Sequence, residues 1–479
     1  MTDLESDWSA DSNEATHISL ATPGHVLHTF NPKFTYPIFG EEERIFGYQG
    51  LKINLKYHAS DMRPVLQVTY NKKFKAVGDT EPTDLKKILE DFLPKTAFEK
   101  TTDFEAAIES TSPDWEPPGE LWKTIQSGAK TFEVWKGSLA DMPIQQMVKR
   151  IQILVPFFIE AGTLLELREP EWSLDRWTVF LLYQKTTENH APKTSPYTFI
   201  GYSTCYRYFL YQPTTPPSSP PAKRQQVVPA SSHDITFPLP EIKFSALPCR
   251  SRISQFIILP PYQGGGNGSR LYNAIFDYFL QDPKTIEITV EDPNESFDDL
   301  RDINDLSRLR LDPEFAALKI NNKCSVRAKG PIPSDIVDTD LLEKIRTRYK
   351  IAPRQFYRVV EMQLLSLIPL GVRQTLIEVS KKSIPDLPAK EHEYQLWTLW
   401  VKKRLYKHNK MMLMQLDRPE RLEKLDETTG SVEADFGRLL RVSDQRSKGS
   451  IVANGKRSSL DDDMAADGGE PSSKKVKFS

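Results

Sequence analysis

A glycine-rich stretch at residues 263–268 is the first part of the sequence with the residue types and spacing of a ligand site. It follows an apolar run at 256–259 and precedes an amphipathic stretch. A strand that runs through glycines into a helix leaves backbone N–H groups pointing at one spot, where the helix dipole adds positive potential. Glycine also lets a phosphate approach the backbone closely. The stretch therefore predicts an anion site whose donors begin at Gln263, because Pro260 and Pro261 lack an N–H.

The glycine cluster by itself has a simpler interpretation, which is a turn that only connects a strand to a helix. No Gly-Lys-Ser/Thr follows it, so it is not a Walker loop. Ser269 stands where a dinucleotide-binding fingerprint would need its last glycine. The residues of the loop thus indicate phosphate binding without identifying the ligand.

Two carboxylates, Glu291 and Asp292, follow a strand expected at 285–290. A reaction that uses a lysine amine as nucleophile needs a proton acceptor, because roughly one lysine in a thousand is neutral near pH 7. A carboxylate at the end of a strand is suited to that role. The alternative is that Glu291 caps a turn that Asp292 begins, and the residues alone leave both interpretations open.

Acidic and aromatic residues elsewhere have the chemistry to bind a basic peptide. The acidic run at 41–43 and the pair at 298–299 would attract a tail rich in lysine and arginine. Trp177 and Tyr206 are of the type that lies against lysine stems. Solvated surface charge and ordinary sheet packing explain the same residues equally well.

The cysteines raise a different possibility, nucleophilic catalysis by a thiol. Cys205, Cys249 and Cys324 are far apart and form no CxxC pair, which argues against a disulfide framework or a metal site. Cys205 is a candidate nucleophile, but no histidine is near it in the sequence. Buried packing is the more common role of such a residue, so we expect neither a cysteine nucleophile nor a metal site.

The elements that must position these groups alternate between strands and helices. The period-two patterns and the β-branched and aromatic content predict strands at 51–57, 65–70, 131–136, 177–184 and 199–211. Helices are expected at 84–93 and at 144–160, the latter kinked or shifted by Pro156. The strand at 253–259, the helix at 269–280 and the strand at 285–290 form a βαβ unit. We therefore predict an α/β (α+β) fold with a mostly parallel or mixed sheet.

The predicted domain organisation has five parts. Residues 1–30 are expected to be a flexible leader, 31–143 a small mixed α/β domain, 144–340 the ligand-binding domain, 341–427 a helical domain and 428–479 a disordered tail. A proline- and serine-rich segment at 212–248 is expected to be an exposed loop inserted between two strands. The tail carries a basic cluster, Lys474 to Lys477, of the kind that acts in nuclear import.

The composition excludes several classes of protein. The 479 residues are 39% hydrophobic and 27% charged, with a net charge of -2, which fits a soluble globular protein and excludes a globally basic nucleic-acid binder. The first 13 residues are acidic and polar, so we expect no signal peptide. No uncharged apolar segment is long enough to cross a bilayer. An intracellular protein is the expectation.

Three sequence blocks carry a resemblance to a known family. They are FGYQGLKI at 46–53, ILPPYQG at 258–264, and ITVEDPN at 288–294 followed by LRD at 300–302. In this order they resemble the type B histone acetyltransferase catalytic subunits of fungal type, which belong to the GCN5-related N-acetyltransferase superfamily. The spacing Gln263-x-x-Gly266-x-Gly268 is similar to the pyrophosphate-loop motif of that superfamily. The resemblance covers roughly residues 36–365, and the segment 212–248 departs from the shorter connection expected there.

The resemblance implies a GNAT acetyltransferase fold with a mixed central sheet. It also implies direct transfer of an acetyl group from acetyl-CoA to lysines in the N-terminal tail of newly made histone four, in chromatin assembly. Glu291 matches the catalytic glutamate of the family, with Glu160 and Asp292 as further acidic candidates. The implied acetyl-CoA contacts are Phe256, Ile257, Ile258, Gln263, Gly264, Gly265, Gly266, Asn267, Gly268, Ser269 and Asn294.

The implied histone-tail contacts are Glu41, Glu42, Glu43, Trp177, Tyr206, Arg207 and Tyr208. A WD-repeat histone-binding chaperone is the implied partner, and the cytoplasm and nucleus are the implied compartments, with no direct contact to nucleic acid or membrane. Another protein or a small amine as acceptor is the alternative function. A non-catalytic histone-binding scaffold on the same fold is a further alternative.

Overall fold

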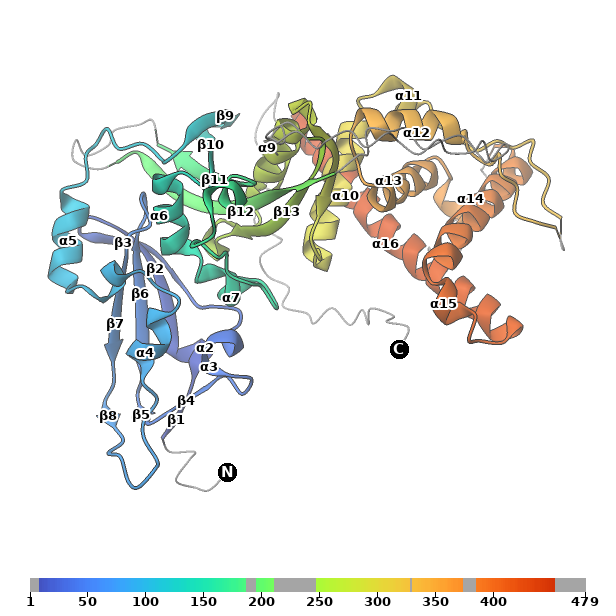
Figure 1. The fold of residues 1–479 in the computed structure, drawn as a ribbon. Coiled ribbons are helices and arrows are strands. Elements are labelled where there is room, and N and C mark those ends of the chain that lie inside the picture. Colours follow the sequence, from blue (N-terminus) through green and yellow to red (C-terminus); the bar gives the residue numbers. More distant parts are fainter. Residues whose placement is uncertain (1–7, 187–194, 211–246, 328–329, 374–384, 453–479) are drawn as a thin grey trace, which may run out of the picture. The chain divides into compact units, whose positions relative to one another are not determined.

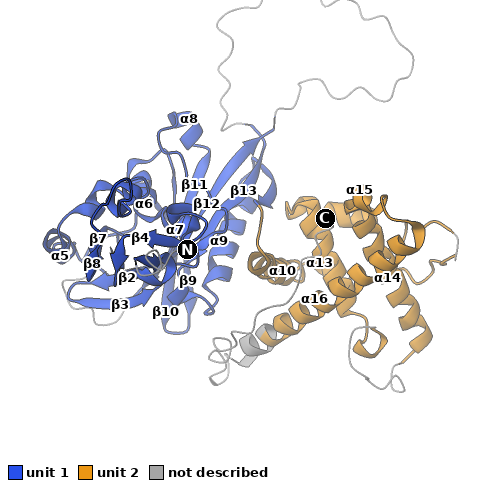
Figure 2. Cartoon of the chain, turned by 90° about the horizontal axis from the view of Figure 1, so that it is seen from below, with its two compact units in different colours: residues 1–291 blue, residues 292–479 orange. Residues whose placement is uncertain are grey.

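The computed structural model describes residues 8–186, 195–210, 247–327, 330–373 and 385–452. The chain forms two compact units, residues 1–291 and 292–479 (Figures 1 and 2). The first unit combines two larger sheets with helices, and the described part of the second is helical. The division falls directly after Glu291, whereas the sequence predicted a boundary at 340.

A six-stranded sheet forms the centre of the first unit. In chain order its strands are β9 (Glu120–Ser127), β10 (Lys130–Ser138), β11 (Trp177–Lys185), β12 (Tyr197–Phe209), β13 (Cys249–Ile258) and β14 (Thr285–Val290). Their order in the sheet is β14-β13-β12-β11-β10-β9, and all neighbours are antiparallel except β13 and β14. The parallel pair exists because α9 (Asn267–Gln281) carries the chain back between these strands. The predicted βαβ unit and mixed sheet are confirmed.

The parallel pair separates partway along β13. The register joins β14 to β13 from Cys249 to Ile253, and the Glu291 amide then donates to the Ile253 carbonyl at 2.9 Å. Residues 254–258 continue β13 and pair with β12 alone among the described strands. Glu291 therefore lies at the point where the two strands diverge.

The N-terminal region forms a second sheet of four strands. These are β2 (Thr16–Thr22), β3 (His25–Phe30), β6 (Lys52–His58) and β7 (Pro64–Thr69), in the order β3-β2-β6-β7. Two short ribbons accompany it, β1 (Ser9–Asp11) with β4 (Arg44–Phe46) and β5 (Tyr48–Gln49) with β8 (Lys72–Lys73). The predicted leader at 1–30 is wrong for residues 9–30. Ile18 and Leu20 of β2 are fully buried and β2 pairs in parallel with β6, so burial of alternate side chains orders this stretch.

Short helices connect and cover the strands of the first unit. They are α2 (Ser12–Ala15), α3 (Tyr36–Phe39), α4 (Leu85–Glu90), α5 (Thr101–Glu109), α6 (Met142–Ile151), α7 (Leu154–Phe158) and α8 (Glu171–Leu174), with 3₁₀ turns at η1 (Lys95–Phe98) and η3 (Pro260–Tyr262). The helix predicted at 144–160 is interrupted at residues 152–153, ahead of Pro156. A proline ring clashes with the carbonyl four residues earlier, which places the break there.

One hydrophobic core joins the two larger sheets. Ile18 and Leu55 of the N-terminal sheet belong to the same buried cluster as Leu154 of α7 and Val179 and Tyr202 of the central sheet. Residues 31–143 thus share a core with the strands that follow, and β9 and β10 belong to the central sheet itself. The boundary predicted at 143 does not coincide with a division of the structure.

The second unit is built from α10 (Glu295–Leu309), α11 (Pro313–Ala316), α12 (Thr339–Arg348), α13 (Pro353–Ser366), η4 (Leu370–Val372), α14 (Leu387–His408), α15 (Lys410–Leu413) and α16 (Arg418–Val452) (Figure 2). The prediction of disorder from residue 428 is wrong as far as Val452, because α16 continues to that residue and buries Phe436 and Leu439. The basic cluster at 474–477 lies outside the described residues, as does the predicted proline-rich loop at 212–248 except for its last two residues. Within the described ranges no helix is long and apolar enough to cross a membrane.

Candidate active site

Glu291 directly follows β14 and is held by hydroxyl groups from the neighbouring strands. Its Oε2 accepts a hydrogen bond of 2.6 Å from Ser254 Oγ, and its Oε1 accepts one of 3.3 Å from the Tyr206 hydroxyl. The Arg252 guanidinium lies 4.0 Å from the same Oε1 and donates to the Tyr206 hydroxyl at 3.2 Å. The Glu291 side chain nevertheless remains 40% exposed. The carboxylate therefore has a fixed orientation and stays accessible to a substrate.

Tyr206 is the centre of a stack beside Glu291. The Trp177 ring lies 4.8 Å from the Tyr206 ring, centroid to centroid. The guanidinium groups of Arg176 and Arg252 lie 5.4 Å and 5.9 Å from the centroid of the Tyr206 ring. The register of β11 and β12 places Trp177 opposite Tyr206, so the contact follows from the pairing of the strands. This stack fixes the hydroxyl that donates to Glu291.

The glycine-rich loop leaves β13 and enters α9 with the predicted glycines in unusual conformations. Gly264 and Gly266 have φ angles of 80° and 74°, values that side chains with a Cβ rarely adopt. Gly266 is the N-cap of α9, so the first amides of the helix lie at this loop without helical acceptors. A Cβ built on Gly264 would meet no atom within 4 Å, which makes the loop an open edge. These features of the loop suit the binding of an anion.

Three carbonyl groups in and just before this loop accept hydrogen bonds from side chains. Gln263 Nε2 donates to the Ile258 carbonyl at 2.8 Å, and Asn267 Nδ2 donates to the Tyr262 carbonyl at 2.8 Å. Arg270 Nη1 donates to the Gly265 carbonyl at 2.5 Å. Oxygen atoms that would repel a phosphate are thus engaged inside the loop. Gln263 and Asn267, which the resemblance implies as cofactor contacts, hold the loop in shape through these bonds.

Three further residues were predicted to act in catalysis or cofactor binding: Glu160, Asp292 and Asn294. Glu160 is exposed and has no recorded side-chain partner among the described residues. Asp292 is exposed, with a φ of 35°, and begins the second unit. Asn294, predicted to contact acetyl-CoA, caps α10 through a 2.9 Å hydrogen bond from the Phe297 amide to its Oδ1. Helix capping accounts for the choice of asparagine there.

The acidic run at 41–43 separates into two kinds of residue. Glu41 and Glu42 are exposed. The Glu43 carboxylate accepts hydrogen bonds from the Thr35 amide at 2.7 Å, the Tyr36 amide at 3.1 Å and Asn13 Nδ2 at 2.7 Å. The bond from the Thr35 amide is the main reason that the pKa of Glu43 lies below its ordinary value of 4.5. Glu43 thus ties three segments of the N-terminal region together.

Of the predicted tail contacts on β12, alternate residues lie on opposite faces of the strand. Tyr206 faces the cluster around Glu291, and Tyr208, on the same face, is 57% exposed. Arg207 points to the other face, where its guanidinium lies 3.9 Å from Asp282 at the C-terminal end of α9. The structure therefore brings Trp177 and Tyr206 to Glu291 but turns Arg207 away from it.

The competing cysteine mechanism finds no support in the surroundings of Cys205. The side chain is fully buried, and its Sγ lies 3.9 Å from the Ser203 hydroxyl. Burial raises the pKa of the thiol far above its ordinary value of 9.0, so the thiolate nucleophile is disfavoured. Among the described residues no group of histidine, cysteine and acidic side chains has the arrangement of a metal site.

Sequence reasoning missed Ser254, Arg252 and Arg176. The first two are alternate residues of β13, beside the strand β14 that Glu291 directly follows. Polar residues at alternate positions of a strand indicate one shared polar face. That signal, read together with the parallel pairing to β14, would have placed Ser254 and Arg252 at the carboxylate.

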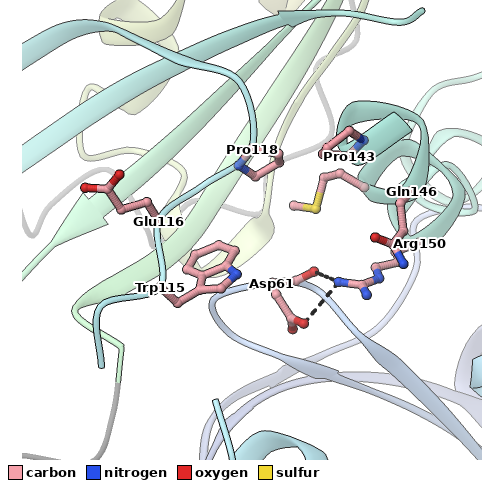
Figure 3. Close-up of a pocket in the computed structure, with 8 residues that line it drawn as sticks. Asp61, Trp115, Glu116, Pro118, Pro143, Gln146 and Arg150 are labelled. Atoms are coloured by element: carbon pink, nitrogen blue, oxygen red, sulfur yellow. Dashed lines mark hydrogen bonds and ion pairs between the residues drawn. The ribbon is translucent and has the colours of Figure 1, made fainter. Parts of the chain in front are cut away.

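A separate cavity of about 210 Å³ lies in the first unit between α6 and residues 115–118 (Figure 3). Its walls include Trp115, Met147 and the ion pair in which Arg150 Nη1 lies 3.0 Å from Asp61 Oδ2. Asp61 also binds His58, at 2.8 Å. None of the predicted site residues lines this cavity, and its charged pair is already neutralised, so it is not the candidate active site.

The divergent parallel pair, the glycine loop at the start of α9 and the accessible glutamate define an N-acetyltransferase of the GNAT type. Comparisons with known proteins agree. Residues 8–160 match the family model "Histone acetyl transferase HAT1 N-terminus", and residues 302–367 match "Fungal HAT1, C-terminal".

Proteins named histone acetyltransferase type B catalytic subunit are similar to nearly the whole chain. The one from Pyricularia oryzae is 46% identical over 99% of both chains, and the one from Gibberella zeae is 46% identical over 96% of both. The one from Neurospora crassa is 43% identical over 99% of this chain and 98% of its own. The chain belongs to the type B histone acetyltransferase catalytic subunit family. It is an acetyltransferase that acts on histones, and acetyl-CoA is the co-substrate that this family implies.

Proposed function

We propose that this enzyme acetylates lysines in the N-terminal tail of newly synthesised histone four, with Glu291 as the general base. The observation that carries the proposal is the Glu291 carboxylate, held by Ser254 and Tyr206 and still 40% exposed at the divergence of β13 and β14. A group in this position can accept the proton of a lysine amine, directly or through a water molecule.

The loop at 263–268 is the proposed site for the phosphates of acetyl-CoA. Two observations fit that role, namely the positive φ angles that open the backbone at Gly264 and Gly266 and the engagement of the loop carbonyls by side chains. When bound, acetyl-CoA supplies the thioester that donates the acetyl group. The part of β13 beyond the end of β14, residues 256–258, would align the pantetheine arm. Ser269, in the first turn of α9, belongs to the same phosphate site.

The mechanism assigned to these residues is direct transfer. Glu291 takes the proton from the acceptor amine, which makes the nitrogen nucleophilic. Ser254 and Tyr206 keep the carboxylate oxygens aimed at the crevice, so little reorganisation is needed when the proton moves. Asp292 and Glu160 are proposed as acidic neighbours that attract the substrate. The buried, protonated Cys205 thiol supports a route without an acetylated enzyme.

The acceptor peptide is proposed to lie over Trp177, Tyr206 and Tyr208, with Glu41 and Glu42 as exposed acids that attract its basic residues. A WD-repeat histone-binding chaperone is the proposed partner, in chromatin assembly. The cytoplasm and nucleus are the proposed compartments, and neither nucleic acid nor membrane is a proposed direct partner.

The test compares acetyl transfer from acetyl-CoA to three acceptors: a peptide of the histone-four tail, a scrambled peptide of the same composition, and spermidine. We expect the tail peptide to have the highest kcat/KM. Equal rates on the three acceptors would contradict the proposed specificity and favour a general amine acetyltransferase, which is the alternative function.

A further inference from the structure

The turn between β9 and β10 lies beside the glycine loop because Arg270 bridges the two. Arg270 Nη1 donates to the Gly265 carbonyl and to Asn267 Oδ1, at 2.5 and 2.8 Å, while Nη2 donates to Ser127 Oγ at 2.8 Å. The guanidinium also lies 4.3 Å from the centroid of the Phe132 ring. A single side chain of α9 therefore fixes the loop against both strands of the hairpin.

Lys130 emerges on the same face of this hairpin. It pairs directly with Ser127 in the β9–β10 register, and directly opposed residues of an antiparallel pair point to the same side. Phe132 is two residues further along β10 and so also shares that side. Since both Ser127 and Phe132 contact Arg270, Lys130 is on the face that meets the glycine loop.

The Lys130 ammonium is available for a ligand. The residue is exposed, and no partner of its side chain is recorded among the described residues. The nearby guanidinium of Arg270 is used within the protein, because it is spread over a carbonyl, an amide oxygen, a hydroxyl and an aromatic ring. Lys130 is thus an exposed cation on this face to which the described part of the chain offers no partner.

We propose that Lys130 binds the 3′-phosphate of coenzyme A and that Arg270 is a positioning residue that holds the hairpin and the loop together. The inference rests on the proposed cofactor loop. Coenzyme A carries a pyrophosphate and a separate 3′-phosphate on its ribose. The loop amides suit the pyrophosphate, and a compact ammonium on a flexible stem suits the remaining, more exposed phosphate.

The proposal separates two effects on binding. Loss of Lys130 removes a contact to one phosphate, whereas loss of Arg270 disturbs the shape of the loop that receives the pyrophosphate. Isothermal titration calorimetry of the full chain with coenzyme A and with 3′-dephospho-coenzyme A measures both effects without an activity assay. We expect the wild-type protein to bind coenzyme A about fivefold more tightly than the dephospho form, as for an exposed ion pair.

In Lys130→Ala we expect this preference to fall to about one, with the affinity for dephospho-coenzyme A unchanged. In Arg270→Ala we expect both ligands to weaken in parallel, so that their ratio is retained. Lys72→Ala, at an exposed lysine of β8 in another sheet, is the matched control and should change neither affinity.

A Lys130→Ala variant that keeps the wild-type ratio of affinities would overturn the assignment of the 3′-phosphate. If the ratio of the two affinities fell to about one in Arg270→Ala, the assignment of separate roles to Lys130 and Arg270 would be wrong. If the wild-type protein bound neither ligand, the cofactor loop itself would be wrong, an outcome distinct from a retained ratio.

Discussion

Two glutamates of the first unit, Glu43 and Glu291, show how differently a carboxylate can be used. Glu43 accepts hydrogen bonds from two backbone amides, an asparagine side chain and, at the longer distance of 3.4 Å, the Thr35 hydroxyl, and its pKa is lowered mainly by the bond from the Thr35 amide. Within the described ranges Glu291 accepts hydrogen bonds from two hydroxyl groups, lies 4.0 Å from the Arg252 guanidinium, and keeps 40% of its side chain exposed. Both residues were predicted to belong to the site. The comparison indicates that a carboxylate enclosed by backbone donors organises the fold, whereas one oriented by hydroxyls remains available for proton transfer.

The largest effect is expected at Glu291. Replacing it with glutamine keeps the size of the side chain but removes the proton acceptor, so we expect kcat near pH 7 to fall by about 10²-fold or more. Calorimetry with acetyl-CoA should show unchanged affinity. Glu109→Gln, at an exposed acid of α5 outside the proposed site, is the control and should retain kcat. An unchanged kcat in Glu291→Gln would remove this residue from the mechanism.

Glu43→Gln should act on stability rather than on chemistry. An amide accepts the same backbone donors less well than a carboxylate, so we expect the free energy of unfolding to fall by about 1–3 kcal/mol, while kcat at a permissive temperature changes little. Denaturant unfolding and steady-state kinetics measure the two quantities. A large loss of kcat with normal stability would place Glu43 in the site and break the comparison.

The same residue predicts a pH dependence of stability. The pKa of Glu43 is lower in the folded protein than its ordinary value of 4.5, so the folded state favours the ionised form. Its contribution is complete above pH 4.5 and is lost as the pH falls through the lowered folded value. Unfolding of the wild-type protein and of Glu43→Gln, followed from pH 7 into the acid range, should therefore converge. A constant difference in stability across that range would contradict the assignment.

Ser254 tests whether orientation of the carboxylate matters. Ser254→Ala removes the 2.6 Å hydrogen bond to Glu291, and we expect kcat to fall by roughly three- to tenfold with the KM for acetyl-CoA unchanged. Ser254→Thr restores the hydroxyl and should recover most of the activity. Equal activity of the alanine and threonine variants would show that the bond has no role in turnover.

The smallest effect is expected at Cys205. Because the thiol is buried and its pKa is raised, Cys205→Ala should keep kcat within about twofold and cost only the packing of one small side chain. Activity assays at matched fractions of folded protein check this. Abolished turnover in a folded variant would revive the covalent mechanism.

The sequence predicted the βαβ unit well because its signals are local. The apolar run of β13, the glycines and the apolar face of α9 each mark their own element, and the strand at Thr285–Val290 is confirmed residue for residue. Strands β6 and β7 were predicted, but β2 and β3 were missed because β2 is ordered by a long-range parallel pairing with β6 and by burial in a shared core. The helix from residue 428 to Val452 was missed because its sequence is polar, contains glycines and is charged in blocks, and the packing that orders it comes from other helices.

Parts of the candidate site that depend on residue type could be predicted from the sequence. Parts that depend on how two strands are paired could not. Residue type and order along the chain singled out the loop and Glu291, but only the resemblance to the family favoured a functional role over a plain turn. The contact of Tyr206 with Glu291 depends on which residues of β12 and β13 lie opposite one another, and no local pattern reveals that register. The role of Glu43 likewise depends on a turn that brings the backbone of Thr35 to its carboxylate.

The most direct test of the account is the pH profile of kcat for the wild-type enzyme and for Glu291→Gln, measured with acetyl-CoA and a histone-four tail peptide. If Glu291 is the base, the variant lacks an acceptor for the lysine proton, so its kcat should rise steadily toward high pH as the amine loses that proton to solvent. The deficit relative to the wild-type enzyme should therefore shrink. Parallel profiles, with the same deficit from pH 6 to pH 10, would show that the carboxylate does not act by accepting this proton.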